Sequence, residues 1–140
     1  FEWLISNAGI KREDVFITNA VLCNPRGQSG NNDSPNASEI RNCSGHLEEL
    51  LDIIRPKYVV PLGKAALTAL RIIHPLEIEL REGVGQLIPW NGFQVYPLYH
   101  PGPRAFIWRT KIQQSRDYET LAGVLESELQ RRDYETGRVR

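Results

Sequence analysis

Residues 93–109 join a short apolar run to a proline-rich turn. Together they leave the backbone few conformations, because the run favours a strand and the prolines restrict the residues that follow it. The run from Phe93 to Tyr99 is rich in β-forming residues and predicts a strand. His100 comes next and precedes Pro101, which disfavours the α conformation in the residue before it. His100 should therefore stay extended at the carboxyl end of the strand. In an open α/β sheet, ligands bind at that edge.

Strand-like and helix-like segments alternate along the rest of the chain. Apolar residues at helical spacing predict helices over Phe1–Ala8, from the Asn36 cap to Arg55-Pro56, after Gly63-Lys64, and around Tyr118–Leu129. Runs of β-forming residues predict strands at Asp14–Val21, Lys57–Leu62 and Phe93–Tyr99, and Pro75–Gly92 is expected to be a connector with at most two small β segments. This order predicts an α/β fold with a parallel sheet and right-handed crossovers.

Length and composition limit the function classes. The 140 residues predict one domain, residues 1–140, in which Arg131–Arg140 is expected to be a disordered tail. The 17 basic and 17 acidic residues cancel, which argues against coating nucleic acid by bulk charge but leaves room for a local basic patch.

The ends of the chain and its two cysteines bear on location. No apolar run approaches the roughly 20 residues of a membrane span, no signal peptide opens the chain, and two cysteines make no disulfide framework. We therefore expect a cytoplasmic protein that does not enter the membrane. The sequence contains no Met and begins directly in a helical pattern, so we also expect a fragment, or a protein whose beginning has been removed.

Two polar residues at predicted strand ends are candidates for chemistry. A lone histidine such as His100 is more often a surface residue with its hydrogen bonds satisfied, but the proline-stiffened turn and the strand end favour a function. Asn19 interrupts an apolar strand, where an unpaired amide would cost about 1–3 kcal/mol. It either bonds to a neighbouring loop or reads the edge of a base, because its amide offers a donor and an acceptor side by side.

The remaining candidates have structural alternatives. Cys43 lies on the apolar face of its helix, where packing explains a small hydrophobe, and a four-thiolate iron–sulfur site cannot be completed by Cys23 and Cys43 alone. Gly63-Lys64 opens a helix whose backbone N–H groups suit a phosphate, although a plain β–α turn also explains it. Trp108 stands between two arginines and is the tryptophan placed to meet a base.

Three segments in order resemble the uracil-DNA glycosylase superfamily, above all its bacterial and archaeal type with an iron–sulfur cluster. They are ITNAVLCNP (residues 17–25), YVVPLGKAAL (residues 58–67) and YPLYHPGPR (residues 96–104). The resemblance runs from about Gly9 to Ser127. It implies a three-layer α/β/α fold with a short parallel sheet. The family's first strand, and the acidic, glycine-containing loop that follows it and positions the attacking water, are absent from the three matching segments and from the residues before them.

The resemblance also implies roles for single residues. Asn19 would hydrogen-bond the uracil edge, and His100 would face the uracil and stabilise its departing anion. Cys23 and Cys43 match the third and fourth ligands of a 4Fe-4S cluster, of which only two of the four cysteines are present in this chain. The residues expected to contact DNA are Gly63, Lys64, Gly102, Arg104 and Arg109, while Phe106 or Trp108 would fill the gap left in the stack.

The sequence therefore predicts a DNA repair enzyme, acting as a monomer, that hydrolyses the N-glycosidic bond of a flipped-out uracil in DNA. An alternative is a member of the same fold that binds DNA or a nucleotide without catalysis. A third reading is a small-molecule α/β enzyme with His100 as general base. That reading needs a nucleophile nearby, and the sequence contains neither a G-x-S-x-G motif nor an evident Cys-His pairing.

Overall fold

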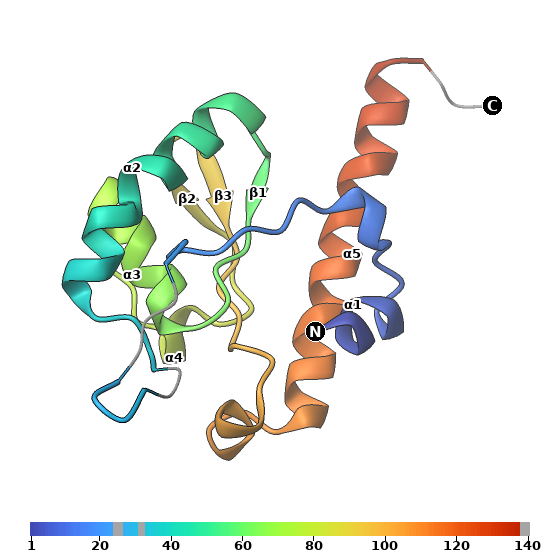
Figure 1. Cartoon of the computed structure of the whole chain (residues 1–140). Coiled ribbons are helices and arrows are strands. Elements are labelled where there is room, and N and C mark those ends of the chain that lie inside the picture. The colour runs from blue at the N-terminus through green and yellow to red at the C-terminus, as the bar shows by residue number, and fades with distance from the viewer. Residues whose placement is uncertain (24–26, 31–32, 138–140) are drawn as a thin grey trace. The chain divides into compact units, whose positions relative to one another are not determined.

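The computed structural model describes residues 1–23, 27–30 and 33–137, and its contacts separate the chain into two compact units (Figure 1). Residues 17–100 form one, called here the sheet unit. Residues 1–16 together with residues 101–140 form the other, called here the helical unit. Asn24 and Pro25, which end the first of the three motifs, lie outside the described residues.

A small mixed sheet lies at the centre of the sheet unit. Its strands are β1 (Tyr58–Val59), β2 (Ile88–Trp90) and β3 (Phe93–Val95), in the order β1-β3-β2. β1 is parallel to β3, as predicted, and an isolated parallel bridge between Leu62 and Leu98 extends this pairing. β2, which lies in the predicted connector, is antiparallel to β3, so the sheet is mixed and only its β1–β3 pair is parallel. The reason is the Asn91-Gly92 turn, where φ is 45° and 82°, as a tight hairpin turn requires.

Two helices pack together in the sheet unit, α2 (Ala37–Ile54) and α3 (Lys64–Ile73), and a short helix α4 (Leu80–Gly83) precedes β2. α2 begins with the predicted capping box: Asn36 Oδ1 accepts from the Glu39 backbone N–H at 2.9 Å, and Glu39 Oε2 accepts from the Asn36 N–H at 2.8 Å. The helices and the sheet enclose one apolar core, whose buried members are Leu51, Leu67, Leu70, Leu76, Leu80, Trp90 and Val95.

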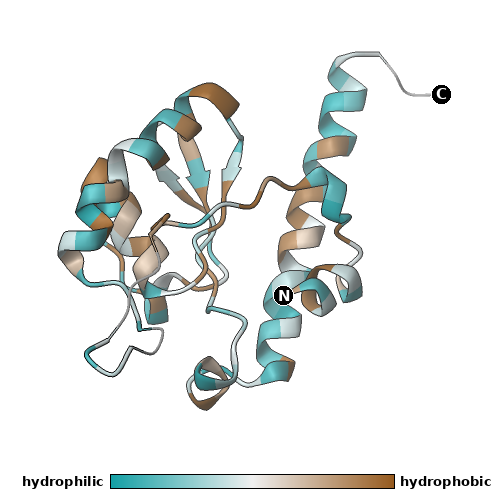
Figure 2. Cartoon of the chain, in the orientation of Figure 1, coloured by the Kyte–Doolittle hydropathy of each residue, from teal (hydrophilic) through white to brown (hydrophobic). Residues whose placement is uncertain are grey.

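The helical unit contains α1 (Glu2–Asn7), the 3-10 helices η1 (Arg12–Asp14) and η2 (Pro103–Ile107), and the long helix α5 (Lys111–Glu135). Along α5, hydrophobic and hydrophilic residues follow one another (Figure 2), and the buried residues include Tyr118, Leu121 and Ala122. α1 packs on α5, and the rings of Phe1 and Tyr118 meet edge-on with 6.4 Å between their centroids. α5 is helical through Glu135, so residues 131–135 are ordered in a helix rather than in the disordered tail that we expected.

The predicted strand Asp14–Val21 is not formed, although the structure describes all of its residues. The boundary between the two units falls within this segment, at Phe16 and Ile17, and among the described residues none of the three sheet strands pairs with it. Phe16 and Ile17 are 64% and 41% exposed. Local β-propensity therefore predicted a strand here that no ladder partner completes.

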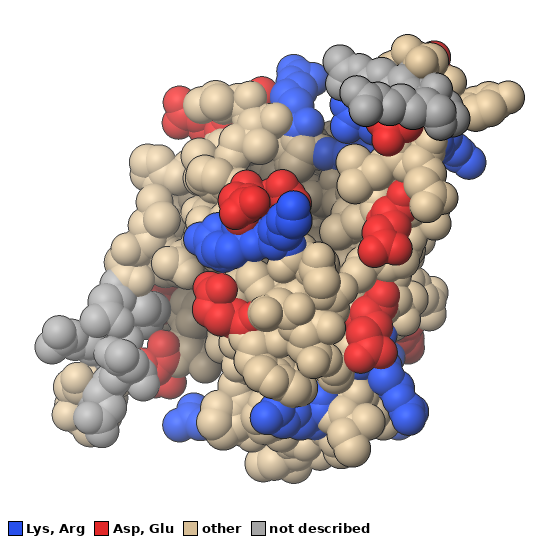
Figure 3. Space-filling view, turned by 90° about the vertical axis from the view of Figure 1, so that its right-hand side faces the viewer, with Lys and Arg blue, Asp and Glu red and all other residues tan. Residues whose placement is uncertain are grey.

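Acidic and basic side chains are interspersed on the face drawn in Figure 3, in keeping with the balanced composition. Within the described part of the chain, no helix has both the length and the apolar character that crossing a membrane requires.

Candidate functional site

His100 lies at the end of the segment that continues β3, as predicted, and its side chain is exposed. Parallel pairing carries this segment alongside the chain that leaves β1. The Leu98 N–H donates to the Pro61 carbonyl at 3.0 Å, and the Gly63 N–H donates to the Leu98 carbonyl at 2.8 Å. The last of these bonds places Gly63 next to His100. Two segments far apart in the sequence thus meet at the carboxyl edge of the sheet, where α/β proteins bind ligands.

Gly63 and His100 lie so close together that a side chain on Gly63 would meet His100. A Cβ atom built on Gly63 would lie 3.1 Å from the Cβ of His100, closer than most side-chain contacts allow. Gly63 is buried, and its φ of 88° is in the region that favours glycine. Its own N–H is used by the Leu98 carbonyl, so Gly63 serves first to make room for His100. Lys64 is exposed at the start of α3, beside this contact.

Asn19 is exposed in the irregular segment before Cys23. It belongs to the sheet unit, as does His100. The strand end at which we expected Asn19 is absent, because residues 14–21, all described, form no strand. That the Asn19 amide meets the His100 imidazole in one cleft remains a prediction.

Cys23 and Cys43 are neighbours, although 19 residues separate them in the sequence. Both are free thiols; Cys23 is exposed and Cys43, on α2, is half-buried. Partial desolvation raises the pKa of the Cys23 thiol, and the nearby Cys43 thiol and Glu39 carboxylate raise that pKa further. Two adjacent thiols are the donors that an iron–sulfur cluster uses. They supply half of a four-thiolate set, and no cluster of three or more metal-ligating side chains occurs among the described residues.

The residues after His100 form an exposed loop that ends at α5. Gly102 is extended, and Arg104 in η2 is exposed. Trp108 is 79% exposed, in keeping with its predicted availability, whereas Phe106 is half-buried. Ile107 is equally exposed at 79% and was not singled out from the sequence.

Arg109, one of the residues predicted to contact DNA, forms an ion pair within the chain. Its Nε and Nη2 donate to the two carboxylate oxygens of Asp117 at 2.8 and 2.6 Å, a bidentate ion pair within the helical unit. Asp117 is only 7% exposed and was missed in the sequence analysis. The signal was a charged residue on the buried face of α5, next to Tyr118 and one turn before Leu121.

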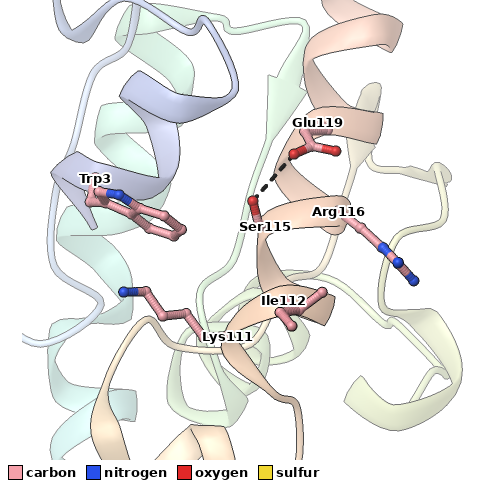
Figure 4. Close-up of a pocket in the computed structure, with 6 residues that line it drawn as sticks. All are labelled: Trp3, Lys111, Ile112, Ser115, Arg116 and Glu119. Carbon is pink, nitrogen blue, oxygen red and sulfur yellow. Dashed lines mark hydrogen bonds between the residues drawn. The ribbon is translucent and has the colours of Figure 1, made fainter.

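A shallow groove of about 390 Å³ lies between α1 and the first turns of α5 (Figure 4). The Nζ of Lys111 stands 4.2 Å from the centre of the Trp3 ring, and Ser115 Oγ donates to Glu119 Oε1 at 3.3 Å. Ile112 and Arg116 complete the lining. None of the residues predicted to bind uracil or DNA lines this groove.

Comparison with known proteins gives consistent matches. Residues 1–122 match the family model described as the uracil DNA glycosylase superfamily. The chain is 38% identical over 124 residues to a type-4 uracil-DNA glycosylase of Saccharolobus solfataricus, which covers 85% of this chain and 56% of that protein. It is 36% identical over 119 residues to a type-5 uracil-DNA glycosylase of Pyrobaculum aerophilum, with 84% and 47% covered. A type-4 enzyme of Thermotoga maritima is 34% identical over 114 residues, with 81% and 55% covered. The chain spans about half the length of these curated relatives.

Proposed function

This chain belongs to the uracil DNA glycosylase superfamily, as its three motifs predicted, and we propose on that basis that it takes part in removing uracil from DNA. The reaction is hydrolysis of the N-glycosidic bond of a uracil that has left the base stack. The observation that carries the proposal is the contact of His100 with Gly63 at the carboxyl edge of the sheet.

His100 is the proposed catalytic residue. Cleavage of the base–sugar bond leaves negative charge on the uracil ring, and a donor fixed in advance at that charge is worth on the order of 10²–10³ in rate. His100 is held from both sides: Gly63 packs against its Cβ, and Pro101 restricts its backbone. These restraints fix where the His100 side chain leaves the backbone, and a ring N–H that reaches the developing anion from there is the proposed donor.

Asn19 is the proposed reader of the base. Its amide offers one acceptor and one donor group, which complement the N–H and C=O edge of uracil and mismatch the reversed pattern of cytosine. This role requires the exposed segment that carries Asn19 to lie against the uracil held at His100. Both residues belong to the sheet unit, which supports this arrangement.

The loop after His100 is the proposed DNA contact. Arg104 is exposed in η2 and suits a phosphate, and Lys64 stands exposed at the start of α3. Ile107 and Trp108 present large apolar side chains to solvent, as a side chain that fills the space of an extruded base must. Because Phe106 is half-buried, we favour Trp108 and Ile107 for this role.

Cys23 and Cys43 are the proposed partial ligand set of an iron–sulfur cluster. When bound, such a cluster supplies structural cross-linking through its thiolate ligands. It would tie the chain at Cys23 to α2 at Cys43, where the two thiols already lie side by side. The other two thiolates would have to come from outside the 140 residues, which contain two cysteines.

The proposed setting is that of a monomer acting on uracil-containing DNA in the cytoplasm. The family match supports the DNA substrate.

Release of free uracil tests the proposed function. The chain is incubated with a uracil-containing oligonucleotide, abasic sites are detected by alkaline cleavage, and DNA affinity is measured in parallel. We expect His100→Ala to lower release by on the order of 10²–10³-fold, with affinity for the same oligonucleotide within a few-fold of the original. If the chain binds uracil-containing strands and releases no base, and His100→Ala only weakens that binding, the non-catalytic alternative is correct.

A further inference from the structure

The exposed end of η2 can insert side chains into DNA at low entropic cost only if its backbone is already fixed on the protein. Ile107 and Trp108 are each 79% exposed, and little of their own surface packs against the protein. A flexible loop would lose conformational freedom on inserting such residues, and that loss opposes binding. A loop already fixed on the protein loses less.

Arg109, directly after Trp108, is held through both its backbone and its side chain. Its N–H donates to the Ala105 carbonyl at 2.9 Å and closes the last turn of η2. Its own carbonyl accepts from Gln114 Nε2 at 3.2 Å. Its guanidinium makes the two bonds to Asp117 at 2.8 and 2.6 Å. Together these contacts attach the end of η2 to one face of α5.

The α5 side of this attachment is rigid. Asp117 and Gln114 are 7% and 1% exposed, in the first turns of a long helix. The helix begins at a capping box, in which Thr110 Oγ1 accepts from the Gln113 N–H at 3.3 Å and Gln113 Oε1 accepts from the Thr110 N–H at 2.9 Å. A planar guanidinium held by two parallel bonds to a buried carboxylate has one orientation.

We propose that the Arg109–Asp117 pair is a clamp that orients Ile107 and Trp108 for insertion into duplex DNA, with Asp117 and Gln114 as positioning residues. The inference rests on the proposed function. It replaces the phosphate contact that we predicted for Arg109 and leaves Arg104 as the arginine of this loop that meets a phosphate.

The clamp should matter for duplex DNA and much less for single strands. A stacked and paired uracil must be extruded, and a side chain that fills its place offsets part of that cost. An unpaired uracil in a single strand needs little extrusion. Loss of the clamp should therefore change the ratio between the two substrates, which a general loss of stability would leave unchanged.

The first experiment measures uracil release by the full chain from a duplex with one U·G pair and from the same strand unpaired. In Asp117→Asn the duplex rate should fall on the order of tenfold, because a small misplacement of a positioned group carries a penalty of this size, while the single-strand rate stays within about twofold. Glu126→Gln is the matched control, since it makes the same chemical change at an exposed site of α5 and should leave both rates unchanged. Equal falls on both substrates would overturn the clamp.

Arg109→Lys is a milder second variant, for use if Asp117→Asn does not fold. It keeps a cation beside Asp117 but loses the planar fork, so its duplex-to-single-strand ratio should lie between those of the unmodified chain and Asp117→Asn. A duplex-to-single-strand rate ratio equal to that of the unmodified chain would show that the bidentate guanidinium contact is not needed to orient the loop.

The second experiment measures proteolysis and does not depend on uracil release. Arg104 lies in η2, so the rate of tryptic cleavage after Arg104 reports how well the loop is held. Cleavage should rise several-fold in Asp117→Asn and not in Glu126→Gln, at a temperature where circular dichroism shows both to be folded. Unchanged cleavage overturns the clamp whether or not uracil is released. Faster cleavage in a chain that releases no uracil from any substrate supports the anchor and overturns the proposed function instead.

Discussion

At the residue scale, the packing of Gly63 against His100 explains why a glycine stands at the start of α3. Gly63→Ala would place a methyl group 3.1 Å from the His100 Cβ and would impose on alanine a backbone conformation, φ 88° and ψ 177°, that is essentially restricted to glycine and costs about 1–3 kcal/mol. We expect this variant to displace the imidazole and to lower uracil release by at least about tenfold. Gly92→Ala is the matched control, because its φ is also positive at 82° but nothing lies within 4 Å of the added Cβ. If both variants lose activity and stability alike, the contact with His100 has no special role.

At the scale of elements, α2 depends on its first turn. The capping box joins Asn36 and Glu39, and the helix then carries Cys43 to the neighbourhood of Cys23. Asn36→Ala removes the side-chain acceptor for the Glu39 N–H, so the free energy of unfolding should fall by about 1 kcal/mol. Denaturant titration followed by circular dichroism measures this. Asn42→Ala, at an exposed position inside the same helix, should instead be neutral or slightly stabilising, since alanine has the higher helix propensity. A similar loss in both variants would mean that the cap contributes nothing.

At the scale of the whole molecule, the chain has two compact units, and an alkaline titration should report on the helical one. Burial raises the pKa of Tyr118 and the Asp117 carboxylate raises it further, so the hydroxyl stays protonated in the folded state. An unfolded tyrosine ionises near pH 10, at about its usual pKa. The stabilisation linked to Tyr118 is therefore complete below about pH 10 and is lost as the pH rises further.

Tyr118→Phe tests this linkage. The Tyr118 hydroxyl is buried without a hydrogen-bond partner among the described residues, so its removal should be neutral or stabilising near pH 7. Between about pH 9 and 11, where an unfolded tyrosine titrates, the thermal midpoint of the unmodified chain should fall faster than that of the variant. Tyr134→Phe, at an exposed position of the same helix, is the control and should follow the unmodified chain. Parallel curves for the unmodified chain and Tyr118→Phe would contradict the raised pKa.

Much of the architecture could be read from local patterns. The Asn36 cap, the helical spacing that follows it and the turn after β1 place α2 and α3, because capping and periodicity depend on residues within one or two turns. The same is true of His100 at a strand end before proline. The antiparallel strand β2 could also have been predicted, because Asn91-Gly92 is a typical hairpin turn that our prediction of the connector did not use.

The sequence by itself determined the family, the order of most elements and the residue types at the candidate site. Only the tertiary structure decided that residues 14–21 form no strand, that Cys23 lies near Cys43, and that Arg109 binds Asp117. The physical reason is the range of the interactions. Helix caps and turns depend on residues that are near neighbours along the chain. A strand instead needs a partner strand, and an ion pair forms with whichever opposite charge the fold brings close. Neither can be predicted from the local sequence.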